Sequence, residues 1–275
     1  MKKTVLFLLL LACTAFLFVG CGEDETGGIG GGGAGNKVQD GLIYELNEDG
    51  DGYTVTGVGT LTETDVVIPD KHNNKPVTAI GVSAFEGCRS QLTSVEIPDT
   101  VTRIERYAFY ECKRLTKVVV PDSVTYIGFG AFYHCRELVS ISLPFVGESA
   151  EAEENTHLRY VFGESIPDAL EKVVITGGKE IADNAFLGCG NLVSLELPFG
   201  IERIGEHAFA SCTKLTTLEI PAGVTEIGTG AFAACEALQT VRFGGTVLEW
   251  TALTKDVELG ASVGEYKVIC SDGEL

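Results

Sequence analysis

The chain has 275 residues, of which 45% are hydrophobic and 8% aromatic, enough for one sizeable hydrophobic core. The formal net charge of −19 excludes the basic surface that a nucleic-acid-binding protein presents. The chain lacks the catalytic and nucleotide-binding motifs "GxSxG", "HExxH" and a "GxGxxG" after a predicted strand. Its four histidines do not recur at a common spacing. We therefore expect no catalytic residue, no metal and no cofactor.

Residues 1–20 are predicted to be a lipoprotein signal peptide. Lys2 and Lys3 precede the apolar run "TVLFLLLLACTAFLFV", which is short for a membrane span. The run is followed by Gly20 and Cys21, and the resulting "FVGC" resembles a bacterial lipobox. That resemblance implies cleavage before Cys21 and lipidation of Cys21. An ordinary secretory signal is the alternative interpretation.

Residues 21–36 are predicted to be a flexible tether behind the lipid. The segment "GEDETGGIGGGGAGN" is rich in glycine, and such a chain spans about 20–25 Å root-mean-square. A phosphate-binding loop is the alternative, but no predicted strand precedes the glycines and no "GK[ST]" follows them.

Residues 37–62 are predicted to form a β-hairpin that caps the start of the fold. Two alternating runs flank the polar turn "NEDGDG" in residues 41–59. Asn47, Asp49 and Asp51 match the first ligand positions of a calcium-binding loop, but the twelfth position is Val58, where a bidentate Glu is needed. We therefore expect a tight turn.

Residues 63–243 contain an internal repeat. The dipeptide Ala-Phe recurs at a nearly constant interval, with an Ile before it, a Cys three positions after the Phe, and then "LxxVxIP" or a close variant. One interval, between Phe132 and Phe186, is longer than two ordinary ones together, and it predicts an insertion around 145–165. The repeated aromatic residues are Phe85, Phe109, Phe132, Phe186, Phe209 and Phe232.

The repeat predicts a mainly β solenoid. Alternation in "LTTLEI" is typical of a strand, and Pro221 ends that strand because it has no N–H to donate. One repeat cannot cover its own apolar face, so neighbouring repeats must stack. Residues 244–275, with the single Trp250, are predicted to cap the far end.

The pattern "IxxxAFxxCxxLxxVxIP" resembles the BspA-type (Treponema pallidum-type) leucine-rich repeats of bacterial surface proteins, over about residues 65–243. The resemblance implies a leucine-rich-repeat solenoid. It also implies a non-catalytic protein-interaction or adhesion module, because BspA-like proteins are associated with binding host matrix proteins such as fibronectin and fibrinogen.

Six cysteines occupy one position of the repeat, and three interpretations are open. Disulfides suit an exported chain with an even set. Metal binding lacks a CxxC or a paired His. A structural ladder of small buried thiols, each packed beneath the next turn, is the one that we favour. These residues are Cys88, Cys112, Cys135, Cys189, Cys212 and Cys235.

Two surfaces are candidates for binding. The first is the outward face of the predicted strands, which is polar, mixed in charge and without an aromatic cluster. The second is the acidic insertion loop, for which a solvated loop without function is the alternative. The candidate face comprises Glu96, Lys117, Ser142, Lys172, Glu196, Glu219 and Arg242, and the candidate loop Glu148, Glu151, Glu153 and Glu154.

We therefore expect a monomeric protein outside the cytoplasm, at the outer membrane or cell surface, held to the membrane only by the lipid on Cys21. Its expected partner is a protein, in particular one of the host extracellular matrix. Two alternatives are a structural component of a surface assembly and a glycan-binding lipoprotein. The strand face argues against the glycan alternative, because it offers no aromatic platform.

Overall fold

The computed structural model describes residues 41–88, 91–163, 165–255 and 266–275. Asn36–Leu275 form one compact unit. The predicted signal peptide, the tether and Cys21 lie outside the described residues.

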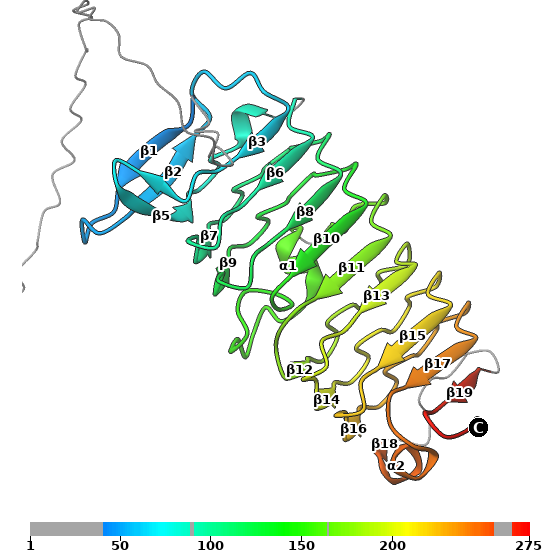
Figure 1. Ribbon diagram of the computed structural model, residues 1–275. Helices are drawn as coiled ribbons and strands as arrows, with labels where there is room; N and C mark the ends of the chain where they lie inside the picture. Colours follow the sequence, from blue (N-terminus) through cyan, green and yellow to red (C-terminus); the bar gives the residue numbers. More distant parts are fainter. Residues whose placement is uncertain (1–40, 89–90, 164, 256–265) are drawn as a thin grey trace, which may run out of the picture. The chain divides into compact units, whose positions relative to one another are not determined.

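The "LxxVxIP" segments form parallel strands that we call the front sheet (Figure 1). Six of the strands pair in the order β13-β11-β10-β8-β6-β3, and three pair in the order β15-β17-β19. The register places equivalent repeat positions opposite one another, since Ser140 pairs with both Lys117 and Lys172. The strands are β3 (Asp65–Val67), β6 (Ser94–Glu96), β8 (Lys117–Val119), β10 (Ser140–Leu143), β11 (Lys172–Ile175), β13 (Ser194–Glu196), β15 (Thr217–Ile220), β17 (Thr240–Phe243) and β19 (Lys267–Ile269).

A second set of strands, most of them very short, forms what we call the side sheets. The Ile before each Ala-Phe lies in one of these strands and is buried. One sheet has the order β1-β2-β5-β7-β9, with β4 also paired to β5, and the other β12-β14-β16-β18. The strands are β1 (Ile43–Leu46), β2 (Tyr53–Gly57), β4 (Lys71–His72), β5 (Lys75–Ile80), β7 (Arg103–Ile104), β9 (Tyr126–Ile127), β12 (Glu180–Ile181), β14 (Arg203–Ile204), β16 (Glu226–Ile227) and β18 (Thr254–Lys255). The predicted mainly β solenoid is confirmed.

The repeated Phe side chains stack along the core. The ring centroids of Phe109 and Phe132 are 5.1 Å apart with the planes at 2°, and those of Phe209 and Phe232 are 6.0 Å apart at 9°. The backbone beside them is paired from turn to turn, because the Phe109 N–H donates to the Ala131 carbonyl at 2.8 Å. The Ala is required because its short side chain is fully buried beside the Phe.

The insertion contains a one-turn helix, α1 (Leu158–Val161), which replaces the Ala-Phe turn. The Phe132 N–H donates to the Val161 carbonyl at 3.1 Å, and the Phe162 ring lies 6.5 Å from the Phe132 ring. Toward the preceding turn Val161 and Phe162 thus stand where Ala and Phe stand elsewhere, and both are fully buried. Toward the following turn the Leu158 N–H, and not that of Phe162, donates to the Ala185 carbonyl at 2.8 Å. The long interval in the repeat therefore conceals a complete turn of the solenoid.

The N-terminal residues extend a side sheet. β1 and β2 pair antiparallel, and β2 pairs with β5 in parallel. A second hairpin, β4–β5, follows, and its turn residues Asn73 and Asn74 have φ of 47° and 63°. Asparagine tolerates this left-handed conformation better than most residues. Sequence analysis did not predict this hairpin.

The C-terminal residues add to both kinds of sheet. β18 pairs with β16, and β19 pairs with β17, both in parallel. Between β17 and β18 lies α2 (Val247–Ala252), whose Thr246 and Glu249 form a capping box. Trp250 is buried with its ring 5.3 Å from that of Phe243. The strands β18 and β19 thus extend both kinds of sheet by one further strand each.

Most turns hold non-glycine residues in the left-handed region. The position before Ala-Phe has positive φ in six turns and the position before Cys in five, although the residues there differ widely. The side chains at these two positions vary, but the backbone there is left-handed in nearly every turn. The residues before Ala-Phe are Ser83, Tyr107, Gly130, Asn184, His207 and Gly230, and those before Cys are Glu111, His134, Gly188, Ser211 and Ala234.

We expect Phe209→Ala to lower the free energy of unfolding by about 3–5 kcal/mol, because it opens a cavity within the ring stack. Phe199→Ala is the control, since the Phe199 side chain is 94% exposed and its loss is expected to change stability by less than about 0.5 kcal/mol. Urea unfolding followed by circular dichroism measures both. Equal losses from the two variants would contradict the stacked core.

A pair of adjacent alanines tests the left-handed positions. Ala234 has φ of 54°, whereas Ala233 is not among the residues with positive φ, and both side chains are half-buried. We expect Ala234→Gly to raise the free energy of unfolding by up to about 1 kcal/mol, because it relieves left-handed strain. Ala233→Gly is expected to lower it by about 0.5–1 kcal/mol through added chain entropy. Thermal unfolding would refute the assignment if both changes had the same sign.

Candidate interaction surfaces

The strand register gathers the predicted binding face into two adjacent rows on the front sheet. In the central row Ser142 pairs with Val119 and Val174, and Val174 pairs with Glu196. Further along the same row Glu219 pairs with Arg242. Lys117 and Lys172 belong to the neighbouring row. Glu96 lies at the end of β6, in the central row.

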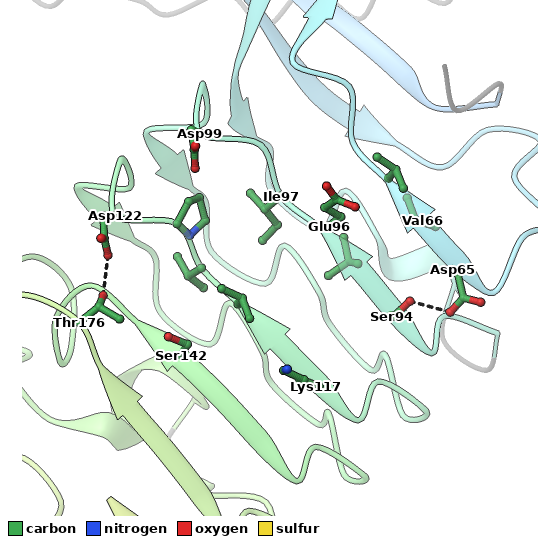
Figure 2. Close-up of a pocket in the computed structure, with 15 residues that line it drawn as sticks. Asp65, Val66, Ser94, Glu96, Ile97, Asp99, Lys117, Asp122, Ser142 and Thr176 are labelled. Carbon is green, nitrogen blue, oxygen red and sulfur yellow. Dashed lines mark hydrogen bonds between the residues drawn. The ribbon is translucent and has the colours of Figure 1, made fainter. Parts of the chain in front are cut away.

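A groove of ≈ 710 Å³ crosses this face over β3, β6, β8 and β10 (Figure 2). Its walls include apolar side chains, of which Val119 is the most open, with 51% of the residue exposed. Charged side chains lie around the apolar part, as Figure 2 shows for Asp65, Glu96 and Lys117. An apolar centre with a polar rim is the general pattern of a protein-binding surface.

Hydrogen bonds between strands fix several of the polar groups around the groove. Asp65 accepts from the Ser94 hydroxyl at 2.6 Å and from the Thr93 hydroxyl at 2.9 Å, and these bonds lower the pKa of Asp65. At the other end Thr176 donates to Asp122 at 2.5 Å. Asp65 therefore stays ionised and oriented along the strand face.

A second hollow, of ≈ 590 Å³, lies on the C-terminal half of the front sheet and was missed by sequence analysis. Glu196, Glu219 and Arg242 line it together with Phe199, which is 94% exposed. Phe145 occupies the equivalent position after β10 but is buried. The sequence does not show which of the two residues is buried, because each is the last residue of an "LPF" triplet.

Glu196 is less available for binding than the sequence suggests. Its carboxylate hydrogen-bonds the Lys172 ammonium in the adjacent strand. Both side chains are exposed, so the pair adds little stability, and its two opposite charges are engaged with each other while it is formed. Within the part of the chain that the structure describes, Lys117 and Glu219 of the face form no ion pair.

The insertion loop divides into a structural part and an exposed part. The Glu148 carbonyl accepts from the Ile127 N–H at 2.9 Å, and its carboxylate accepts from Asn155 at 3.0 Å. Burial, assisted by Glu148, raises the pKa of Tyr160. Glu148 therefore continues the side-sheet ladder. Glu151, Glu153 and Glu154 are exposed and remain candidates for contact with a partner.

The six repeat cysteines are buried and free. Each of four thiols hydrogen-bonds a Phe carbonyl in the preceding turn, for example Cys235 with Phe209 at 3.1 Å and Cys135 with Phe109 at 3.3 Å. The other two are Cys112 and Cys212. The thiols thus donate between turns as well as filling a small slot. Cys270, outside the repeat, is also buried and free.

Burial suppresses ionisation of these thiols. Loss of solvent raises the pKa of Cys135 and of Cys189 to about 12, and that of Cys235 to about 11. The pKa values of Cys112 and Cys212 are raised further by the same cause. Because the thiolate is the nucleophile and metal ligand, these cysteines are inert at neutral pH.

The sequence motif that resembles a calcium loop serves the hairpin instead. The Asn47 amide donates to the Thr78 hydroxyl at 2.8 Å and accepts from the Thr54 hydroxyl at 2.8 Å. Across the described ranges, no three His, Cys, Asp or Glu side chains gather as a metal site. Nor does any helix in those ranges have the length and apolar character needed to cross a membrane.

Comparison with known proteins identifies a family. The family model described as the BspA type leucine rich repeat region matches residues 64–152 and 179–252, in six copies. A solved leucine-rich repeat protein of T. pallidum is 27% identical, with 82% of this chain and 97% of that chain covered and a TM-score of 0.44. No curated protein matches the chain.

Two further solved structures are more distant. A leucine-rich repeat protein of Bacteroides ovatus is 20% identical, with 82% of this chain and 91% of that chain covered and a TM-score of 0.29. A leucine rich cell surface protein of Faecalibacterium prausnitzii is 19% identical, with 79% and 97% covered and a TM-score of 0.29.

We expect the buried thiols to resist alkylation in the folded protein. For the chain from residue 37, iodoacetamide at pH 8 is expected to leave the six repeat cysteines unmodified, because their pKa values are raised far above 8. In urea, all seven thiols of the described residues are expected to react. Mass spectrometry counts the adducts. Fewer than seven adducts after unfolding would instead indicate disulfides.

Proposed function

Because the chain belongs to the BspA-type leucine-rich repeat family, we propose that it is a non-catalytic protein-interaction module that binds through the front sheet. The observation that carries this proposal is the groove over β3, β6, β8 and β10, with its partly apolar walls and charged rim. Parallel strands in fixed register hold these side chains at repeating intervals, so the surface is rigid before binding. Rigidity lowers the ordering cost of association.

We further propose that the protein acts at the bacterial surface as a lipoprotein anchored through Cys21, and that its partner is a protein of the host extracellular matrix. The lipobox-like "FVGC" and the glycine-rich segment behind it support the anchor. The family resemblance supports the matrix partner. A structural role in a surface assembly would instead require contacts between copies of this chain.

The groove can be tested with two matched substitutions. Val119→Glu puts a charge into the groove, and Val193→Glu makes the same change outside it; these valines are 51% and 46% exposed, so both variants are expected to fold. Fibronectin, fibrinogen and collagen are immobilised, and binding of the chain from residue 37 is measured by surface plasmon resonance. We expect Val119→Glu to weaken binding at least about tenfold and Val193→Glu to leave it unchanged.

A third variant tests the acidic loop. Reversing Glu151, Glu153 and Glu154 to Lys keeps the backbone, whereas deleting 148–158 would remove the Glu148 ladder bonds and the buried Leu158. We expect little change in affinity from the reversal if the front sheet is the site. Absence of binding to every matrix protein would refute the proposed partner, and self-association in sedimentation would favour the assembly role.

A further inference from the structure

We infer that the turns following β7 and β9 form a second docking surface, for an acidic protein segment with apolar side chains. This inference rests on the proposed protein-binding function but uses a different part of the solenoid. We call the surface the aromatic–basic platform. It is formed by Arg106, Tyr107, Tyr110, Phe129, Tyr133 and His134, of which Arg106 is exposed and the others are half-buried.

The rings of the platform form one continuous cluster. Tyr133 lies at its centre, with ring centroids 5.8 Å from Tyr110, 6.1 Å from Tyr107 and 3.9 Å from His134. Phe129 lies 6.0 Å from Tyr107. The backbone joins the two turns, since the Glu111 N–H donates to the Tyr133 carbonyl at 2.8 Å. Two adjacent turns thus present a single aromatic surface.

The fold itself does not require these aromatic rings. Tyr110 and Tyr133 each follow the repeated Phe, and later turns have Leu187, Ala210 and Ala233 at that position. The turns with alanine keep the same buried Phe stack and the same turn hydrogen bonds. Large aromatic side chains left partly in water at a position that alanine satisfies indicate a role at the surface.

Two glycines in the neighbouring turns leave room for the tyrosine rings to lie directly against the backbone. A Cβ at Gly130 would lie 2.8 Å from the Tyr107 ring, and a Cβ at Gly163 would lie 2.7 Å from the Tyr133 ring. The rings therefore rest against the backbone of the following turn. Tyrosines fixed in this way lose little side-chain entropy when a partner covers them.

The charge around the platform is opposite to that of the whole chain. Lys113, Arg114 and Arg136 are exposed in the same turns, and Arg106 lies over the Tyr107 ring at 5.7 Å. The acidic groups in these turns are Glu105, Glu111 and the exposed Glu137. Glu105 pairs with Arg103 of β7 at 3.0 Å, and Glu111 is 3.6 Å from Lys113 and 3.7 Å from His134. Four cations and three carboxylates lie in these turns, and one of the carboxylates is paired with Arg103 outside them, in a chain of net charge −19. An acidic partner is complementary to this excess.

The arrangement of the rings favours a polypeptide over a sugar chain. Tyr110 stacks on Tyr133 at 24°, and Tyr133 stacks on His134 at 24°, so neighbouring rings cover part of one another's faces. A pyranose ring needs a free flat face. Clustered Tyr and Arg are instead the residues in which protein hot spots are enriched.

The test measures peptide binding to the full chain by fluorescence polarisation. The probe is a labelled synthetic peptide in which Glu alternates with Leu and Phe, and a second peptide has Lys in place of Glu. We expect saturable binding of the acidic peptide alone, weakened as salt rises. Tyr110→Ala combined with Tyr133→Ala is expected to weaken it at least about tenfold.

Two controls separate this site from the front sheet and from a folding defect. Leu187→Ala truncates a side chain that is 39% exposed at the same repeat position and is expected to change nothing. Val119→Glu, in the groove, is also expected to leave peptide binding unchanged. Equal binding of the lysine peptide, full affinity in the double tyrosine variant, or displacement of the peptide by hyaluronate oligosaccharides would overturn the inference. Matrix binding that persists in such a case leaves the proposed function intact.

Discussion

The structure depends on one constraint: most turns obtain their hydrogen bonds and their apolar cover from neighbouring turns of the same design. The Phe109 N–H donates to the Ala131 carbonyl, and the Cys135 thiol donates to the Phe109 carbonyl. The Phe109 ring stacks between the rings of the two neighbouring turns. A core position therefore needs a side chain of similar size and shape in each turn of this design. This requirement explains why Ile, Ala, Phe and Cys recur together and why the thiols belong to the packing.

The same constraint leaves the outward positions free to vary, and the chain uses that freedom unevenly. Among the later turns, the position after the repeated Phe is occupied by alanine at 210 and 233, whereas Tyr110 and Tyr133 form an aromatic surface in the earlier turns. The front sheet shows a similar contrast between buried Phe145 and exposed Phe199. When one repeat carries a large side chain at a position where other repeats carry a small one, and that side chain is not buried, packing of the core does not explain the difference.

Much of the fold could be predicted from the sequence, because the spacing of Phe and Cys reports directly on the stacking period. The BspA-type resemblance and the mainly β solenoid are both confirmed. The length of the interval between Phe132 and Phe186 indicates a further turn there, but the residues that fill its core, Val161 and Phe162, could not be identified without the letters Ala-Phe. The exposed surfaces were harder to predict. Tyr107 and Tyr133 are far apart in sequence, and their rings meet only because adjacent turns are in register.

The ends of the stack differ from its middle in strand direction. At one end β1 runs antiparallel to β2, and at the other the N–H and carbonyl of Val268 bond to Leu275, so the last residues lie antiparallel along β19. A parallel ladder offers its final edge to any similar strand, including one from another molecule. A reversed strand on that edge presents a mismatched pattern of donors and acceptors. The residues that follow β19 thereby give this edge of the front sheet a hydrogen-bonding pattern unlike that of the parallel strands within the stack.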